Sequence, residues 1–134
     1  MADQSFLVLE NCESLFAVRS NFVFQIVFEK EIYPLPFSKT CIGGFFLYED
    51  FLIPVFSFDK EGFKECSETF VIIDCKGVYV SLPVKNVLEI CKSEVKGVEN
   101  IEHSTLFSEI IFYKNLFEIP VLDFDKLYKL AGFN

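Results

Sequence analysis

Few side chains in this sequence could perform chemistry, and they are scattered along the chain. His103 is the only histidine, and it stands in a polar stretch between Glu102 and Ser104. A Ser-His-acid site would need partners brought from other parts of the fold, and no spacing in the chain indicates them. A histidine in such a loop is typical of a solvated side chain. We therefore expect no catalytic residues, no enzyme activity and no cofactor.

The cysteines do not form a pattern that would hold a metal ion. Their number is odd, no two are spaced as C-x-x-C, and they fall at Cys12, Cys41, Cys66, Cys75 and Cys91. Zinc sites usually show paired ligands at short spacing. The acidic residues likewise lack the spacing of a calcium loop. We interpret the cysteines as reduced, buried thiols of the core and expect no metal site.

Length and charge restrict the class of protein further. The chain has 134 residues, 51% of them hydrophobic, with 18 Phe and a formal net charge of -8. Arg19 is the only arginine and no lysine cluster is present, so nucleic acid and anionic membrane surfaces are poor partners. No apolar run approaches the ~20 residues of a spanning helix. Asp3 stands where a signal peptide requires positive charge, which predicts a cytoplasmic protein.

Short β-rich runs separated by turn residues organise the chain, as in an all-β domain. A helical turn at Ser20 precedes a further strand, and Pro34 and Pro36 predict an extended connection. The polar stretch 59–68 is the best linker. The predicted strands are residues 5–10, 15–19, 42–48, 51–56, 69–75, 78–84, 86–92, 106–113 and 116–122.

The end of the chain differs from the rest. Asp123 is a candidate N-cap, Phe124, Leu127 and Leu130 share one helical face, and Gly132 is a stop signal. This pattern predicts a short C-terminal helix.

The two halves of the chain repeat one another. The "IPV" of residues 53–55 recurs at 119–121, and the pair Val23 and Ile26 recurs 64 residues later at Val87 and Ile90. Earlier in each half, Cys12 with Phe16 matches Cys75 with Tyr79 at an offset of 63 residues. We therefore predict a single domain, residues 1–134, with pseudo-repeated halves at roughly 5–58 and 69–124.

Small closed barrels suit such a repeat, because closure removes exposed sheet edges. Pro54 and Pro120 should then lie near strand ends or edges, where a missing N–H costs little. The repeat favours two filled barrels over one hollow barrel.

The order of these segments resembles the CheW-like domain family of bacterial chemotaxis. The resemblance runs through "FLVL", "LFAV", "VFQI", "PLP", "IGG" and "FLIPV", and continues through "FVIID", "VSLPVKNVLEI" and "LFEIPVLDFDKL", so it covers essentially the whole chain. It implies an all-β, CheW-like fold of two small SH3-like five-stranded β-barrels with a short C-terminal helix. It also implies a non-catalytic adaptor that couples chemoreceptors to a CheA-type histidine kinase.

The resemblance also implies where partners bind. One barrel should take the regulatory domain of the kinase by packing end to end. The groove near Val23, Ile26, Gly44 and Glu49 should take the cytoplasmic tip of the chemoreceptor. Phe22 and Phe24 bracket Val23 and would anchor an interface if they were exposed.

Several positions depart from the family's usual pattern, and three of them are candidate partner-binding residues. Glu49 stands where the family has Arg, Asp50 replaces the following Gly, and Ser81 replaces a Gly of the second half. The reversal at Glu49 would convert an attraction to the usual partner into repulsion. Either the partner has changed its charge in step, or the chain is a divergent CheW-like paralogue with another partner. A simpler reading is that two acids at a hairpin tip keep an edge soluble.

A different class remains open, namely a small lipid- or ligand-binding β-barrel. Such barrels are also cytoplasmic and rich in Phe. They often hold a fatty carboxylate with buried arginines, whereas this chain has only Arg19, and its helix lies at the other end of the sequence.

Overall fold

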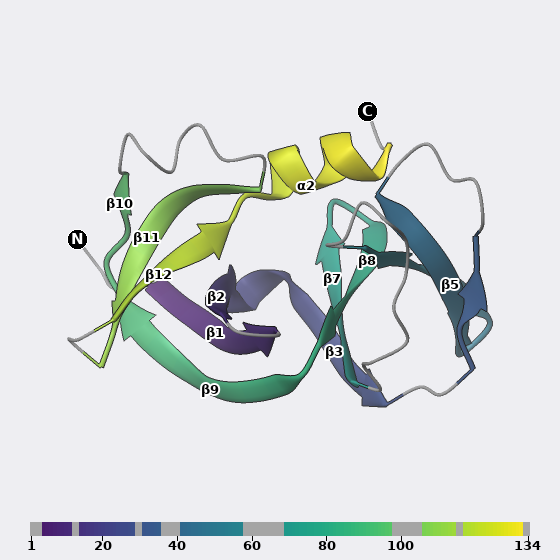
Figure 1. Ribbon diagram of the computed structural model, residues 1–134, viewed down its shortest axis with the longest axis horizontal. Helices are drawn as coiled ribbons and strands as arrows, with labels where there is room; N and C mark the ends of the chain where they lie inside the picture. The colour runs from purple at the N-terminus through teal and green to yellow at the C-terminus, as the bar shows by residue number, and fades with distance from the viewer. Residues whose placement is uncertain are drawn as a thin grey trace.

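Two curled β-sheets lie side by side along the long axis of the molecule, and one helix crosses above the junction between them (Figure 1). This computed structural model describes residues 4–11, 14–28, 31–35, 41–57, 69–97, 106–114 and 117–132. Several residues discussed above lie outside this described part of the chain. They are the predicted linker at 59–68, and Cys12, Cys66 and His103.

Each sheet orders six strands among the described residues. The first sheet runs in the order β10 (Lys96–Gly97), β11 (Phe107–Tyr113), β12 (Phe117–Leu122), β2 (Ser14–Arg19), β1 (Gln4–Asn11) and β9 (Asn86–Ser93). The second runs β3 (Val23–Phe28), β7 (Thr69–Cys75), β8 (Val78–Val84), β6 (Phe51–Phe56), β5 (Ile42–Tyr48) and β4 (Tyr33–Pro34). The 3-10 turn η1 (Ser20–Phe22) joins β2 of the first sheet to β3 of the second.

The two halves of the chain exchange their opening hairpins. The β1–β2 hairpin completes the sheet formed by β9 to β12, and the β7–β8 hairpin completes the sheet formed by β3 to β6. On one side each hairpin meets the other half of the chain through a single parallel pair, Val121 with Ala17 in the first sheet and Val55 with Ser81 in the second. On its other side an antiparallel ladder joins β1 to β9 and β7 to β3. Each curled sheet therefore combines strands from both ends of the sequence, which the spacing of the repeat did not reveal.

The strand registers correct one detail of the sequence comparison. Leu9 pairs with Phe16 in the first hairpin, and Ile73 pairs with Val80 in the equivalent hairpin. Because Leu9 also pairs with Val87 and Ile73 with Val23, the opening hairpins correspond at an offset of 64 residues. Phe16 is therefore equivalent to Val80 and not to Tyr79, as an offset of 63 had suggested.

The predicted all-β fold class with a short C-terminal helix is confirmed. Each sheet has five strands of at least six residues and, at one edge, a two-residue strand that the sequence did not predict. The exact limits of the repeated segments, 5–58 and 69–124, stay a prediction.

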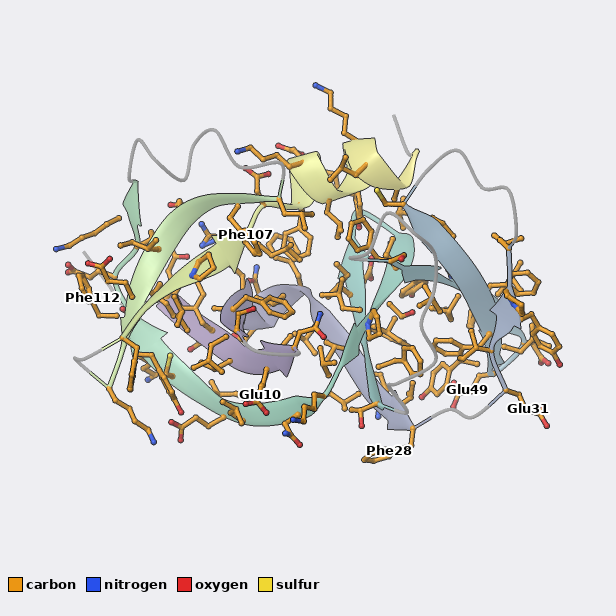
Figure 2. The ribbon with its side chains drawn as sticks, viewed as in Figure 1. Glu10, Phe28, Glu31, Glu49, Phe107 and Phe112 are labelled. Atoms are coloured by element: carbon orange, nitrogen blue, oxygen red, sulfur yellow. The ribbon has the colours of Figure 1, made fainter. Side chains whose placement is uncertain are left out.

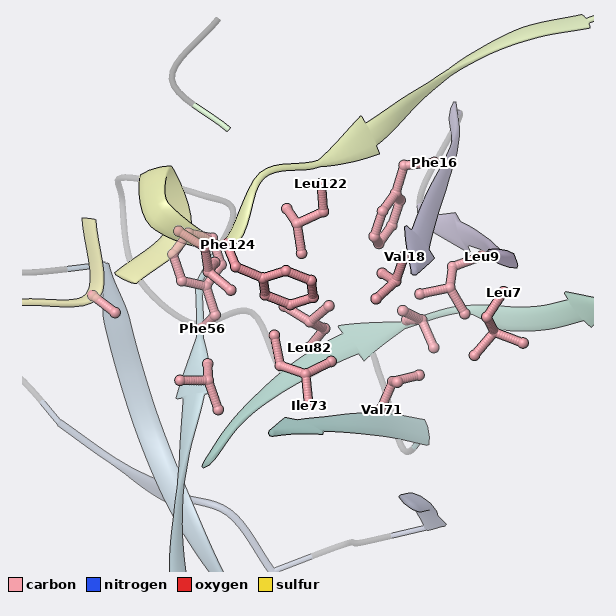
Figure 3. Packing of buried hydrophobic residues seen from close by; sticks show 14 of the residues in the cluster. Leu7, Leu9, Phe16, Val18, Phe56, Val71, Ile73, Leu82, Leu122 and Phe124 are labelled. Carbon is pink, nitrogen blue, oxygen red and sulfur yellow. The ribbon is translucent and has the colours of Figure 1, made fainter. Parts of the chain in front are cut away.

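Hydrophobic side chains fill three layers of the molecule. Alternation along β1 sends Phe6 and Val8 into the interior of the first sheet, while Leu7 and Leu9 face the junction. Phe46 and Phe70 fill the interior of the second sheet. The central layer draws on both sheets and on the helix, with Leu82 and Phe124 among its members (Figure 3). These filled interiors are unlike the open cavity of a lipid carrier.

The helix α2 (Phe124–Ala131) forms as the sequence predicts. Asp123 accepts a hydrogen bond from the Lys126 backbone N–H at 3.2 Å, and Gly132 ends the helix in the left-handed region at φ 90°. Phe124, Leu127 and Ala131 are buried, and Leu130 is half-buried against the same layer.

Helix α2 is also tied to both sheets by hydrogen bonds. The Lys126 ammonium group donates to the Phe107 carbonyl at 2.9 Å, and the Tyr128 hydroxyl donates to the Val78 carbonyl at 2.9 Å. Phe107 opens β11 in the first sheet, whereas Val78 opens β8 in the second. The helix therefore holds the two sheets in one relative arrangement.

Two expectations about single residues were wrong. Pro54 and Pro120 lie inside β6 and β12, with a strand on either side, and not at strand ends or sheet edges. The parallel junction beside each proline contains one pair only, so few ladder hydrogen bonds are lost there. Cys41 and Cys91 are free thiols, but they are half-buried rather than fully buried.

Candidate functional site

Glu49 and Asp50 form the turn between β5 and β6, and Glu49 lies toward one end of the molecule, in the second sheet (Figure 2). Both residues are exposed, and both have positive φ, 47° for Glu49 and 69° for Asp50. Two positive φ angles are typical of a type I′ hairpin turn, which favours Asn-Gly. Neither residue is a glycine, so this turn keeps two carboxylates at a cost in backbone energy.

Exposed apolar side chains surround these two acids. Leu47, Phe51 and Leu52 are 58%, 52% and 59% exposed. The Tyr79 ring lies between those of Phe51 and Phe24, with centroid distances of 5.9 Å and 5.0 Å. We call this surface the acidic end; it comprises Phe24, Leu47, Glu49, Asp50, Phe51, Leu52 and Tyr79.

The edge strand β3 continues this apolar surface. Phe28 is 80% exposed and lies at the margin of the molecule (Figure 2), and Ile26 is also exposed. Val23 is half-buried and packs against the central layer. Phe24 is exposed as an anchor would need to be, but the ring of Phe22 packs on Phe124 at 4.3 Å between centroids. Exposed apolar side chains gathered on one edge are typical of a protein-docking surface.

Gly44 and Ser81 are buried, so their side-chain positions do not lie on the surface. A Cβ at Gly44 would lie 2.8 Å from the Tyr33 carbonyl oxygen, so the close approach of β4 requires glycine there. The Ser81 hydroxyl donates a hydrogen bond to the Pro54 carbonyl at 2.9 Å. Ser81 thereby supports the parallel junction between β6 and β8, and both positions act within the fold.

An open groove of about 470 Å³ lies where the chain passes from one sheet to the other, at Gln4, Ser5, Arg19, Ser20, Asn21 and Phe22. The Arg19 guanidinium donates to Gln4 Oε1 at 2.6 Å and pairs with Glu109 at 2.5 Å. This groove directly precedes Val23, but Ile26, Gly44 and Glu49 do not line it. This groove is therefore a different feature from the predicted receptor surface near Val23, Ile26, Gly44 and Glu49.

Two ionisable groups near the β11–β12 turn have shifted pKa values. The Tyr113 hydroxyl donates to Glu89 Oε1 at 2.6 Å, and this bond, helped by burial, raises the pKa of Tyr113 to about 12. Burial, followed by the charge of Glu89, raises the pKa of the Cys91 thiol. A thiol held in its protonated form is a poor nucleophile.

No cluster of three or more His, Cys, Asp or Glu side chains that could hold a metal ion occurs within the described part of the chain. No described helix has both the length and the apolar character needed to cross a membrane.

Comparison with known proteins gives a match at the level of the fold. No family model matches the sequence, and no curated protein matches it. The chain is similar to the crystal structure of the scaffolding protein TtCheW from Thermoanaerobacter tengcongensis, with a TM-score of 0.80 and 18% identity over 98% of this chain and 96% of that chain. The class that the fold defines is therefore CheW-like, over essentially the full length.

Sequence reasoning missed the aromatic contacts of the acidic end. Phe51 was treated only as a strand residue and Tyr79 only as a repeat position, yet Tyr79 joins Phe51 to Phe24. The alternation of strand residues in "YEDFLIPVF" indicates part of this surface, since it predicts the burial of Ile53 and Val55 and the exposure of Leu52 that the structure shows. Phe51 breaks that alternation because it lies beside the turn.

Proposed function

We propose that this chain is a non-catalytic adaptor of a chemosensory signalling complex, which couples chemoreceptors to a CheA-type histidine kinase in the cytoplasm. The observation that carries the proposal is the likeness to a scaffolding protein of CheW type over 98% of the chain. The filled interiors and the exposed apolar side chains of β3 and of the acidic end agree with a protein that acts through its surface.

Two surfaces are proposed for the two partners. The acidic end, with Glu49 and Asp50, takes the regulatory domain of the kinase by packing of barrel ends. The edge of β3, with Val23 and Ile26, and the adjoining groove take the cytoplasmic tip of the receptor. Gly44 and Ser81 support these surfaces from within and make no direct contact.

Binding of the purified chain to the two partners tests the proposal. Calorimetric titration with the regulatory domain of a chromosomally linked kinase and with the cytoplasmic tip of a linked receptor should give saturable binding to both. Ile26→Asp should weaken receptor binding more than kinase binding, because Ile26 lies on β3 and is not one of the residues of the acidic end. Absence of binding to both partners would refute the adaptor role.

A divergent paralogue with another partner is the second candidate, and Glu49 and Asp50 favour it. The turn keeps two acids at positive φ where the family's pattern has Arg and Gly. Glu49→Arg discriminates between the two candidates. Stronger binding of the variant to the kinase domain would indicate that the chain has left the standard complex. Weaker binding would indicate a kinase whose own charge has changed to match Glu49.

A further inference from the structure

The single arginine of the chain lines the open groove where β2 passes into β3, but the acid that pairs with it does not. The residues that line this groove are Gln4, Ser5, Arg19, Ser20, Asn21 and Phe22. Glu109, which pairs with the Arg19 guanidinium at 2.5 Å, belongs to β11 and is not one of them. The cation of this ion pair therefore borders the groove, whereas the carboxylate does not.

Three contacts hold the Arg19 side chain in place. Besides pairing with Glu109, the guanidinium donates to Gln4 Oε1 at 2.6 Å and lies 5.6 Å from the centroid of the Phe6 ring. The side chain is 23% exposed, so it remains accessible although it is paired. The bonds to Gln4 and Glu109 use two of the five guanidinium N–H groups. A guanidinium held in this way loses little side-chain entropy when it binds a further anion.

The charges around the groove favour an anion as its occupant. Ser5, Ser20 and Asn21 add hydroxyl and amide groups but no charge. Lys92 is exposed and pairs with Ser5 across β9 and β1, so it places a second positive charge beside the groove. Glu94, just beyond the end of β9, is exposed on the same margin. In a chain with a net charge of -8, this is a place where an acidic group meets a cation that is already oriented.

A carboxylate suits this site, because a guanidinium binds a carboxylate through two parallel N–H···O bonds. The groove holds about 470 Å³ and is open, so a side chain carried by another protein can enter it. It directly precedes Val23, the first residue of β3. A partner segment that lies along β3 therefore passes the mouth of the groove and can present an Asp or Glu side chain to it.

We propose that Arg19 recognises an acidic side chain of the docked receptor tip, and that Glu109 competes with this side chain for the guanidinium. This inference rests on the proposed function, since the receptor tip supplies the acid. Glu109 then sets the affinity of the groove, because the incoming carboxylate must take over a guanidinium that is already paired. When Glu109 is neutralised, the same groove should bind an acid more strongly.

A small probe tests the recognition step without a partner protein. The probe is N-acetyl-glutamate N-methylamide, the neutral glutamine analogue is its control, and binding is followed through the backbone amide chemical shifts of Ser20 and Asn21. Glu109→Gln should bind the glutamate probe about tenfold more tightly than wild type does. It should also prefer this probe to the glutamine analogue, and the preference should weaken as salt is added. Arg19→Gln should show no preference between the two probes.

Calorimetric titration with the cytoplasmic tip of a linked receptor applies the same variants to the partner. Glu109→Gln should bind the tip about tenfold more tightly than wild type, and Arg19→Gln about tenfold more weakly. Arg19→Lys keeps the charge but loses the planar fork, so its affinity should fall between those of wild type and Arg19→Gln. An ion pair with a structural role alone predicts instead that neither removal of the cation nor removal of the acid strengthens binding.

Glu118→Gln and Lys129→Gln are the matched controls, since both residues are exposed and neither lines the groove. Each makes the same change of charge as one of the test variants, and each should bind probe and tip as wild type does. Circular dichroism establishes that every variant is folded.

The inference is overturned if folded Glu109→Gln binds the glutamate probe no more tightly than wild type, or if Arg19→Gln still prefers it to the glutamine analogue. It is also overturned if the receptor tip binds wild type and both variants equally. Failure of the proposed function gives a different result, in which the receptor tip does not bind wild type at all. The receptor would then be refuted as the source of the acid, while the probe titration still decides whether Arg19 and Glu109 act as an acid-binding pair.

Discussion

The ring of Phe22 packs on the ring of Phe124 with a centroid separation of 4.3 Å. Phe22 belongs to η1, the turn that carries the chain from one sheet to the other, and Phe124 opens the helix that crosses both sheets. This contact joins the chain crossing at residues 19–23, one of two among the described residues with that at 84–86, to the element that fixes the arrangement of the sheets.

Phe124→Ala should therefore destabilise the whole fold. Phe124 is 8% exposed, and removing a buried phenylalanine ring costs about 3–5 kcal/mol in the free energy of unfolding. Chemical denaturation followed by circular dichroism measures the change. Phe28→Ala is the control, since Phe28 is 80% exposed and its removal should cost less than about 0.5 kcal/mol. Equal effects of the two substitutions would contradict the packing described here.

Ser81→Ala should cost stability and leave partner binding unchanged. The Ser81 hydroxyl is the described side-chain donor to the Pro54 carbonyl, and losing a buried hydrogen bond costs about 1–2 kcal/mol. Alanine fits the space, because Ala17 occupies the equivalent junction of the first sheet. Ser14→Ala, at an exposed position, should change stability by less than about 0.5 kcal/mol. If a folded Ser81→Ala protein lost partner binding, Ser81 would contribute to the docking surface and not only to stability.

The acidic turn should become more stable when its residues suit its backbone. The double substitution E49N/D50G places Asn-Gly at φ 47° and 69° and should raise the free energy of unfolding by about 1 kcal/mol. The converse substitution, Gly77→Asp at φ 84°, should lower it by a similar amount, since a Cβ there meets no atom within 4 Å and only the backbone changes. Thermal unfolding of both variants checks the pair. If E49N/D50G were no more stable than wild type, the turn would not be strained.

Stability should fall at alkaline pH through Tyr113. Its pKa is raised from 10.0 to about 12 in the folded protein, so the unfolded chain releases this proton at a lower pH than the folded chain does. The contribution of Tyr113 is fully present below pH 10 and is lost as pH rises toward 12. The tyrosinate absorbance of wild type minus that of Tyr113→Phe reports this titration.

Glu89→Gln identifies the cause of that shift. It removes the negative charge that accepts the Tyr113 hydrogen bond, so the Tyr113 transition should move toward its ordinary pH. An unchanged transition in Glu89→Gln would assign the shift to burial alone.

Local signals in the sequence were sufficient to predict where most strands and the helix begin and end. The strands at 42–48, 51–56, 69–75 and 78–84 form within the predicted bounds, because each hairpin has a clear two-residue turn and short apolar runs. Asp123 and Gly132 likewise marked the ends of α2, because a capping side chain and a left-handed glycine act within one turn of the helix.

Long-range features were not predictable from the same signals. Nothing local in "FLVLEN" indicates that β1 pairs with β9, about eighty residues away, rather than remaining within its own half. The burial of Ser81 and the exposure of Phe51 also depend on neighbours from other strands. The acidic residues of the candidate site were found from the sequence, whereas the aromatic contacts that surround them required the structure.

The exchange of hairpins between the halves has a consequence during synthesis of the chain. When β1 to β6 have left the ribosome, neither sheet has all its strands, since the first lacks β9 to β12 and the second lacks β7 and β8. The apolar faces of the nascent β1–β2 hairpin therefore stay exposed to aggregation until its partner strands, β9 and β12, are synthesised some seventy or more residues later. Cotranslational folding of this molecule is thus a late event, completed when β12 joins β2 and the terminal helix closes over both sheets.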